Sequence, residues 1–295
     1  MKLGAVFPTT EIGNDPAVIR DWTQTAEELG YDHIVTFDHV LGAEHAGRKP
    51  RLFGPYTEDD PFHEPFTLFA YLAALTERIE LVTGVLITPQ RQTVLIAKQA
   101  AEVDLLSGGR LRLGVGTGWN YVEYESLGLP FEERGPMLDE QVEVMRKLWS
   151  EELLDYTGRY HRIDRASLLP RPERRIPIWF GAIAPVALGR AARLGDGLLL
   201  ASAPSTVAPM VHKTRELVAK EGRDVASFGT EAFIDFSHSR EQWKSELELW
   251  HKLDGTHVSM RAMDTAAQVV GGKHMGYDGP KAYIDALRTF REFVG

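Results

Sequence analysis

The amino-acid sequence predicts an α/β fold, a single (β/α)8 barrel of the TIM type that spans residues 1–295 as one domain. Three observations predict it: eight short β-branched or apolar runs, eight segments with helical spacing of apolar residues, and strict alternation of the two. Such alternation is typical of a parallel sheet, and eight units close a barrel of about 250 residues. No linker or low-complexity tract divides the chain.

The elements follow one another as strand, then helix. Strands are expected at 3–7, 33–37, 79–86, 110–116, 176–181, 197–201, 230–236 and 256–261. Helices are expected at 15–29, 64–76, 91–106, 134–150, 184–194, 206–221, 239–253 and 279–293. Gly30, Gly195 and Gly255 each come just after a helix, where glycine can take the left-handed conformation that ends it. Pro16 and Pro185 stand near helix starts, where a missing N–H costs little.

Three strand-to-helix connections are long: 38–63 after the second strand, 117–133 after the fourth and 262–278 after the eighth. An irregular stretch, 151–175, returns from the fourth helix to the fifth strand. In this fold the loops that leave the C-terminal ends of the strands form the active-site face. We therefore expect the long loops to surround one mouth.

The composition narrows the class of function. The chain has no cysteine, which excludes disulfides, thiolate nucleophiles and Cys-ligated metals. Its formal charge is −9 with acids and bases interspersed, which argues against nucleic-acid and anionic membrane partners. Neither a secretory leader nor an apolar run of about 20 residues is present. We expect a cytoplasmic protein with a small-molecule partner.

The residues at the strand ends exclude several chemistries. No lysine ends a strand, which disfavours a Schiff base, and no set of histidines or carboxylates has metal-ligand spacing, so no metal site is predicted. What remains at the mouth is glycines, the pair Asp38 and His39, and apolar residues. That set suits a flat, largely apolar cofactor.

His39 is the strongest catalytic candidate. An imidazole at a pocket wall can donate or accept a proton near neutral pH. Equally, His39 could form hydrogen bonds only within the long loop that it begins. Gly84 interrupts the β-branched strand LVTGVLI, which indicates a bulge or a close approach of ligand, although tight packing of the barrel explains it as well.

Two further segments carry candidate residues. Gly181, Ala182 and Ala184 join the fifth strand to a helix, whose free N–H groups could bind an anion; an ordinary turn is the alternative. The 42–63 loop contains Phe53 and Tyr56, and a loop of this length is often a lid, although it could be a dimer arm.

The stretch RLRLGVGTGW at 110–119 could be a dinucleotide-binding turn. That motif requires G-x-G-x-x-G with its third glycine opening a helix, and here Trp119 occupies the position of the third glycine. The dinucleotide interpretation therefore fails on spacing. A barrel strand that carries Gly114, Gly116 and Gly118 to the mouth remains.

The segments Thr88-Pro-Gln-Arg-Gln, Ala97-Lys-Gln-Ala-Ala and DLLSGGRLRLGVGTGW at 104–119 resemble the bacterial luciferase-like superfamily, the luciferase-like monooxygenase family of flavin and deazaflavin barrels. The resemblance extends over essentially the whole chain. Asp38-His39 and PFEERG at 130–135 resemble the branch that uses the deazaflavin coenzyme F420.

This resemblance implies roles for individual residues. His39 matches a histidine that handles a proton beside the ring, and Asp38 matches a residue that contacts the ring. Thr83-Gly84-Val85 matches a bulge that backs the ring through a non-proline cis peptide, expected here between Gly84 and Val85. The cofactor set also includes Gly116 and the phosphate cradle of Gly181, Ala182 and Ala184.

One departure concerns the substrate. Family members that oxidise glucose 6-phosphate carry a glutamate directly after Gly-Thr-Gly, where this chain has Trp119. Sugar-phosphate oxidation is therefore not expected, and an indole there suits an apolar substrate pocket. The predicted substrate set comprises Phe53, Tyr56, Trp119, Asn120, Glu123 and Arg261.

The resemblance implies an oxidoreductase that moves a hydride between coenzyme F420 and a small alcohol, enone or imine. Two alternatives stay open: an FMN-dependent monooxygenase that uses reduced flavin and O2, and a non-catalytic flavin- or deazaflavin-binding barrel. Homodimerisation is also implied by the family.

Overall fold

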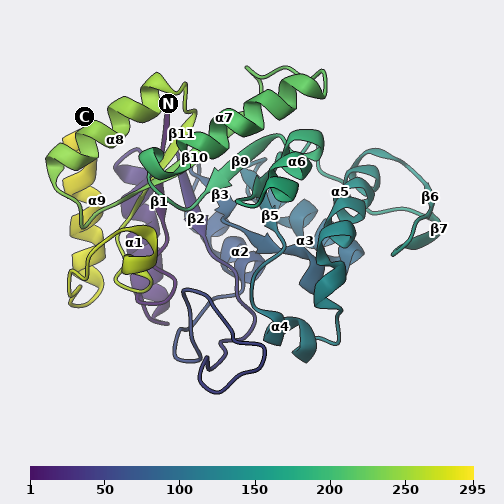
Figure 1. The fold of residues 1–295 in the computed structure, drawn as a ribbon, viewed down its shortest axis with the longest axis horizontal. Coiled ribbons are helices and arrows are strands. Elements are labelled where there is room, and N and C mark those ends of the chain that lie inside the picture. Colours follow the sequence, from purple (N-terminus) through teal and green to yellow (C-terminus); the bar gives the residue numbers. More distant parts are fainter.

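The computed structural model describes residues 1–295, and its strands close into a barrel (Figure 1). Around the ring the hydrogen-bonded order is β3-β2-β1-β11-β10-β9-β8-β5, and β3 pairs with β5 to complete it. Every pairing in the ring is parallel. The strands are β1 (Lys2–Val6), β2 (His33–Thr36), β3 (Glu80–Thr83), β4 (Leu86–Ile87), β5 (Leu111–Gly116), β8 (Ile178–Gly181), β9 (Gly197–Leu200), β10 (Gly229–Asp235) and β11 (His257–Arg261). The predicted α/β barrel is confirmed.

Eight helices at the predicted places surround the ring (Figure 1). They are α1 (Pro16–Glu28), α2 (Pro65–Leu75), α3 (Thr93–Leu106), α5 (Arg134–Ser150), α6 (Pro185–Leu194), α7 (Pro204–Lys220), α8 (Arg240–Lys252) and α9 (Pro280–Val294). Their starts follow from local sequence: the Asp15 side chain accepts from Ala17 N ahead of Pro16, and Ser239 and Gln242 form a capping box for α8. None of the helices is both long and apolar enough to cross a membrane.

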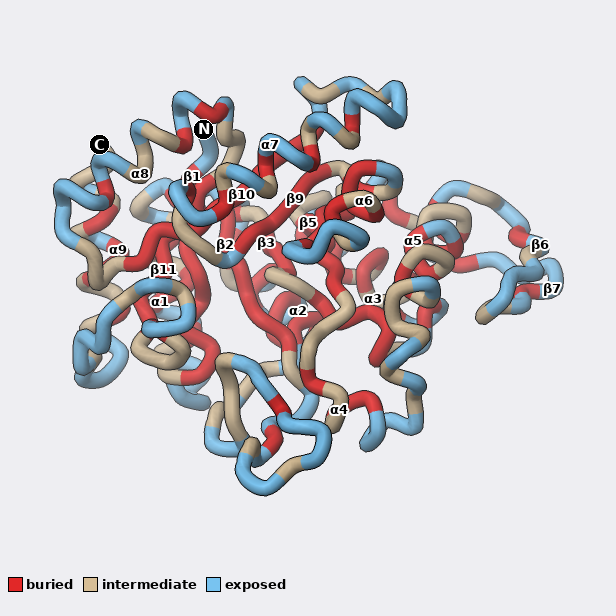
Figure 2. The backbone as a smooth tube through the Cα atoms, viewed as in Figure 1, coloured by how far each residue is buried: buried red, intermediate tan, exposed pale blue.

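The core has two parts because alternate strand residues face opposite sides of the barrel wall. A cluster of 59 buried residues fills the space between the outside of the wall and the helices. A second cluster of eight lies inside the barrel toward the mouth: Val6, Val35, Phe37, Val82, Trp179, Leu199, Phe233 and Met263. Figure 2 shows this pattern as buried strands at the centre and exposed loops around them.

Below the inner apolar cluster, the barrel contains a buried ionic network. Glu231 accepts from Arg112 Nη1 at 2.6 Å and from Ser259 Oγ at 2.6 Å, and its other neighbour is His33 Nε2 at 2.8 Å. Gly4 stands against His33 and Ser259, where any Cβ would overlap their side chains. Burial alone would raise the pKa of Glu231, but His33 and Arg112 outweigh it and hold the pKa well below its usual value.

Three features differ from the expected elements. The strand expected at 79–86 is divided into β3 and β4 by a cis peptide between Gly84 and Val85, as the resemblance implied. The 151–175 stretch contains an antiparallel hairpin, β6 (Leu154–Thr157) and β7 (Arg162–Ala166), which projects beyond α5 (Figure 1). The 117–133 loop contains the short helix α4 (Tyr121–Ser126) and a 3-10 turn at Phe131–Glu133.

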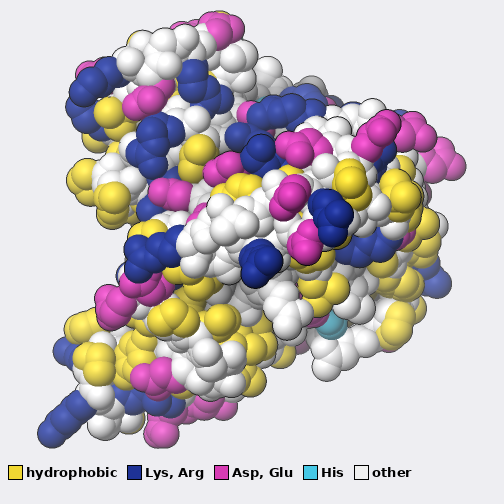
Figure 3. Space-filling model, turned by 90° about the vertical axis from the view of Figure 1, so that its right-hand side faces the viewer, with side chains coloured by type: hydrophobic (Ala, Val, Ile, Leu, Met, Phe, Trp, Pro, Cys, Tyr) yellow, Lys and Arg dark blue, Asp and Glu magenta, His cyan; other side chains and the backbone are white.

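Charges of both signs are mixed on the face of the molecule shown in Figure 3. Figure 3 shows lysine and arginine side chains interspersed with aspartate and glutamate over the face that it presents. This distribution agrees with the small-molecule partner expected from the sequence.

Candidate active site

A bulge in the wall at Gly84 and Val85 forms part of the mouth. Both residues are partly exposed, whereas the residues on either side of them, 81–83 and 86–90, are buried. The Val85 side chain lies in space that neighbouring glycines leave free: a Cβ on Gly116 would come 2.5 Å from Val85 Cγ2, and one on Gly181 would come 2.9 Å from Val85 Cγ1. Real Cβ atoms do not approach so closely, so the glycines of two strands make room for the bulge.

Gly114 and Gly118 have different roles, one within β5 and one just after it. A Cβ on Gly114 would overlap the carbonyl oxygen of Thr83, so this glycine lets β5 approach β3. Gly118 has φ of +64°, the left-handed region, where the chain turns out of β5 toward α4. The three glycines of the 110–119 stretch thus serve close packing and a turn, not a dinucleotide.

His39 lies next to a buried carboxylate at the end of β2. Its Nδ1 is 3.1 Å from Glu123 Oε2, and the two side chains are 8% and 1% exposed. Glu123 Oε1 also accepts from the backbone N–H groups of Val40 at 2.6 Å and Leu41 at 3.2 Å, and Gln90 Nε2 lies 3.3 Å from Oε2. The first turn of α4 is therefore hydrogen-bonded, through Glu123, to the start of the loop at residues 39–41.

This arrangement determines where the imidazole carries its proton. Burial raises the pKa of Glu123, but the hydrogen bonds from His39, Leu41 and Val40 outweigh burial, and its pKa falls below the usual value. An ionised Glu123 only accepts hydrogen bonds, so His39 is protonated on Nδ1. Nε2 of His39 has no hydrogen-bond partner within the protein, so it is free to exchange a proton with a bound molecule.

Aromatic side chains enclose His39. The ring centroids of Phe62, Tyr56 and Trp119 lie 4.9, 5.3 and 5.4 Å from that of the imidazole. Burial raises the pKa of Tyr56 to about 12, so its hydroxyl stays protonated. Two of these rings, Tyr56 and Trp119, were candidates from the sequence; Phe62 was missed because nothing in the loop pattern separates it from Phe53.

Asp38 has both carboxylate oxygens occupied within the protein. Arg91 binds them in bidentate fashion at 2.7 and 2.8 Å, and Ile87 N donates to Oδ2 at 2.8 Å. Burial raises the pKa of Asp38, and Arg91 and Ile87 oppose that rise. Asp38 therefore holds the end of β2 against β4, and its contact with a cofactor stays a prediction. Arg91 was interpreted as part of a scaffold helix, and its role here had no sequence signal.

Four of the proposed substrate residues have the following surroundings in the structure, and their contact with a substrate stays a prediction. Asn120 is buried and caps α4, since its Oδ1 accepts from Val122 N at 3.1 Å. Glu123 positions His39 with all of its oxygens engaged. Arg261 is 2% exposed and donates to Asp235 Oδ2 at 2.8 Å and to the carbonyl oxygens of Met263 and Thr265, inside the wall. Phe53 is 64% exposed on the outside of the loop, beneath the guanidinium of Arg51.

The start of α6 has the features of an anion site. Its N-cap is Ala184, no side chain caps it, and its first turn has no acidic residue. The free N–H groups of that turn and the positive end of the helix dipole favour a phosphate. Gly181 and Ala182 lead directly into it from β8, beside Val85.

A parallel barrel, a bulged third strand with a cis peptide, and a histidine at the end of the second strand together define a barrel of the flavin or deazaflavin class. The chain belongs to the luciferase-like monooxygenase family, whose sequence model matches residues 1–288. The predicted family is thereby confirmed, and with it the prediction of an oxidoreductase-type enzyme at the level of the family.

Named relatives include an F420-dependent dehydrogenase and monooxygenases. An F420-dependent glucose-6-phosphate dehydrogenase of Nakamurella multipartita is 28% identical over 297 residues, covering 93% of this chain and 83% of its own length. Pyrimidine monooxygenase RutA of a Bradyrhizobium species is 32% identical over 217 residues, covering 70% of this chain and 57% of its own. Among solved structures, monooxygenase RslO1 of Streptomyces bottropensis has a TM-score of 0.75 at 20% identity, over 100% of this chain and 98% of its own, which shows a shared fold.

Proposed function

We propose that this protein is a coenzyme F420-dependent oxidoreductase that moves a hydride between the deazaflavin and a small organic substrate of the alcohol, enone or imine type. The observation that carries the proposal is the pair of His39 and Glu123 at a mouth whose wall bulges at Val85. The similarity to an F420-dependent dehydrogenase over 93% of the chain supports the cofactor.

The residues at the mouth fit a flat ring with a phosphate-bearing side chain. Gly84 and Val85 would back the ring, and side chains at Gly116 or Gly181 would fill the cradle beside them. The N–H groups at Ala182 and Ala184, at the uncapped start of α6, would hold the phosphate. The deazaflavin, when bound, supplies or accepts the hydride, and the protein supplies placement and polarity.

His39 donates or accepts the proton that accompanies the hydride. In the neutral form its Nε2 accepts a proton from a substrate hydroxyl, and in the protonated form it donates one to a carbonyl or imine. Glu123 holds Nδ1 protonated in the first case and stabilises the imidazolium in the second. The aromatic side chains of Tyr56, Phe62 and Trp119 exclude water from the exchange.

Titration of the purified protein with deazaflavin and with FMN tests the cofactor. We expect saturable deazaflavin binding and turnover with at least one alcohol, enone or imine. His39→Ala should lower kcat by roughly 100-fold or more and leave the cofactor Kd within about twofold, because general acid–base catalysis contributes about 10²–10⁴. Tight FMN binding without deazaflavin affinity would refute the proposal and favour the FMN-dependent monooxygenase, which the similarity to RutA supports.

We also propose a homodimer built on α2 and α3. Helix α2 has no charged residue although Ala70, Tyr71 and Ala74 are exposed, and α3 exposes Val94 and Leu95. Helices that are apolar on their outer face are normally covered. The charges of α3 on this side, Lys98 and Glu102, pair with each other at 2.7 Å, so the face has no net charge to repel a second copy.

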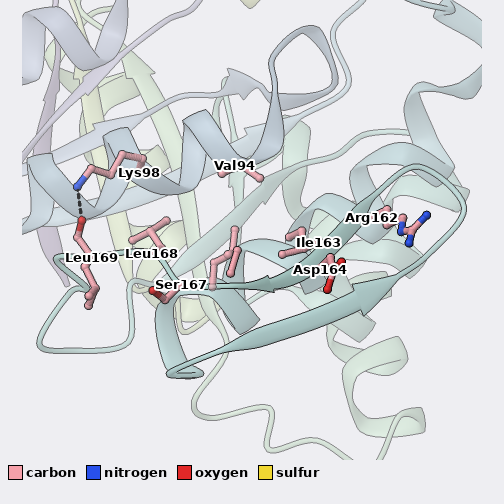
Figure 4. Close-up of a pocket in the computed structure, with 10 residues that line it drawn as sticks. Val94, Lys98, Arg162, Ile163, Asp164, Ser167, Leu168 and Leu169 are labelled. Carbon is pink, nitrogen blue, oxygen red and sulfur yellow. Dashed lines mark hydrogen bonds between the residues drawn. The ribbon is translucent and has the colours of Figure 1, made fainter.

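The face of α3 continues into a groove outside the barrel. Its cavity of about 440 Å³ lies between α3 and β7 and is lined mainly by apolar side chains, among them Ile163, Leu168 and Leu169 (Figure 4). Lys98 Nζ closes one end by donating to Leu169 O at 2.7 Å. Sedimentation at micromolar concentration should show a dimer, and Leu95→Glu should shift it toward a 33.0 kDa monomer. A wild-type monomer would contradict this.

A further inference from the structure

The 38–63 loop contains a cavity that the proposed hydride-transfer site does not use. Its volume is about 580 Å³. The lining residues all come from one stretch of the loop: His45, Ala46, Gly47, Arg48, Arg51, Leu52, Phe53 and Gly54. Two arginines and a histidine thus face one small space in a chain whose formal net charge is −9.

The guanidinium groups at this cavity have no carboxylate partner. Arg48 donates through Nε to Glu44 O at 2.5 Å, which leaves its two terminal nitrogens without a partner in the protein. Arg51 has its Cζ atom 4.5 Å above the ring of Phe53, an arrangement that fixes the guanidinium plane and keeps its N–H edge available. Two acids of the loop are engaged with other partners: Asp60 accepts hydrogen bonds from Thr57, and Asp38 accepts them from Arg91.

His45 adds a third polar group to the lining. Its Nε2 is 2.9 Å from the carbonyl oxygen of Tyr56, which only accepts, so Nε2 carries the proton. Nδ1 then has no hydrogen-bond partner within the protein.

The cavity lies next to the reaction centre, because Trp119 packs against His45 and Gly54 of its lining and against His39. Trp119 lies between the two histidines, with its ring centroid 5.4 Å from that of His39 and 6.0 Å from that of His45. Gly54 packs directly on the indole, where a Cβ would overlap the ring. The loop is held in this place by Tyr121 Oη, which donates to Pro50 O at 2.7 Å.

We propose that this cavity binds a carboxylate or phosphate group belonging to the molecule whose other end lies beside His39. Arginine binds both groups through paired N–H donors, and two guanidiniums without internal partners supply them here. Trp119 then separates an apolar reaction centre from an anion-binding end. The identity of the reacting end rests on the proposed function, whereas the anion site does not.

The first experiment measures anion binding to the cavity in the absence of cofactor and substrate. Isothermal titration calorimetry of the full-length protein with inorganic phosphate and with malonate should show saturable binding. The variant Arg48→Gln/Arg51→Gln should weaken it tenfold or more, because each arginine contributes a charge-assisted pair of hydrogen bonds. Lys49→Gln is the matched control, since Lys49 is adjacent in sequence but does not line the cavity. No binding to the wild type, or equal binding to the double variant, overturns the anion site.

The second experiment identifies the molecule that supplies the anion. If it is the substrate, the ratio of kcat/KM for a keto acid to that for its methyl ester falls tenfold or more in the double variant, and the cofactor Kd is unchanged. If it is the acidic tail of the deazaflavin, the affinity ratio between the full cofactor and the tail-less ring falls instead. An unchanged value of both ratios overturns the link to the reaction. Failure of the proposed function would appear separately, as absent deazaflavin binding with phosphate binding intact.

Discussion

Replacing Glu123 with glutamine tests the role of this carboxylate in orienting His39. Glu123 Oε1 accepts from two backbone N–H groups, so the glutamine carbonyl oxygen would stay there, and its NH2 would face His39 Nδ1 and Gln90 Nε2. An NH2 group only donates, so His39 would have to accept at Nδ1 and carry its proton on Nε2. In that tautomer Nε2 cannot accept a proton from a substrate.

The magnitude follows from the hydrogen bond that is lost. A hydrogen bond to a charged group contributes about 1.5–3 kcal/mol, and about 1.4 kcal/mol corresponds to tenfold in rate, so kcat should fall roughly 10- to 100-fold. The deazaflavin Kd should change little, because Glu123 is buried behind His39. Stopped-flow reduction or oxidation of bound deazaflavin measures the chemical step, and Glu125→Gln on the exposed side of α4 is the matched control. A Glu123→Gln rate equal to that of the control would refute the assignment of the tautomer.

Two further predictions concern the wall. Gly116→Ala places a Cβ 2.5 Å from Val85 Cγ2, so Val85 must shift, and overpacking of this kind costs about 1–3 kcal/mol. A fluorescence titration should therefore show cofactor affinity at least fivefold lower than in the wild type. Gly189→Ala is the control, because only one atom lies within 4 Å of its added Cβ, and it should leave the affinity unchanged. Glu231→Gln removes the fully buried partner of Arg112, which then keeps only the partly exposed Glu80 at 3.0 Å, and should lower the free energy of unfolding at pH 7 by up to about 3–5 kcal/mol in urea denaturation. The pKa of Glu231 in the folded protein lies below its unfolded value of about 4.3, so the stabilisation is present above that pH and is lost as the pH falls toward the folded pKa. The difference in free energy of unfolding between wild type and variant should therefore shrink below about pH 4. A difference that stays constant with pH would exclude this account.

The barrel could be predicted from the sequence because its signals are local. Periodicity within each segment and glycines at helix ends identify the alternating elements without any knowledge of tertiary contacts. The β6–β7 hairpin was missed because β6 alternates over only four residues and in β7 only Ile163 is buried, which is too little pattern to predict a strand pair. Helix α4 was missed because six residues are too few to show helical periodicity.

At the candidate site, the sequence predicted where His39 lies but not which residues form hydrogen bonds with the site's side chains. His39 is the third residue after the end of β2, so the fold alone places it at the mouth. Its partner Glu123 is 84 residues away, and Arg91 is 53 residues from Asp38, so no spacing rule links them. The same limit holds at Asn120, Arg261 and Phe53, because a position in the sequence does not specify which partners the side chain contacts.

Trp119 and Glu123 together determine the polarity of this mouth. The position directly after Gly-Thr-Gly holds an indole, so no carboxylate projects there from the end of β5. The carboxylate of this site comes instead from the first turn of α4, and it is fully engaged with His39 and the backbone at residues 40 and 41. A charge held in that way orients the histidine and does not contact the substrate, while the indole lies tilted against the same imidazole, with the ring centroids 5.4 Å apart. The site therefore has one exchangeable proton, on His39, and an apolar wall next to it, so polar recognition of a substrate has to come from elsewhere in the mouth, and the arginines of the 38–63 loop are placed to supply it.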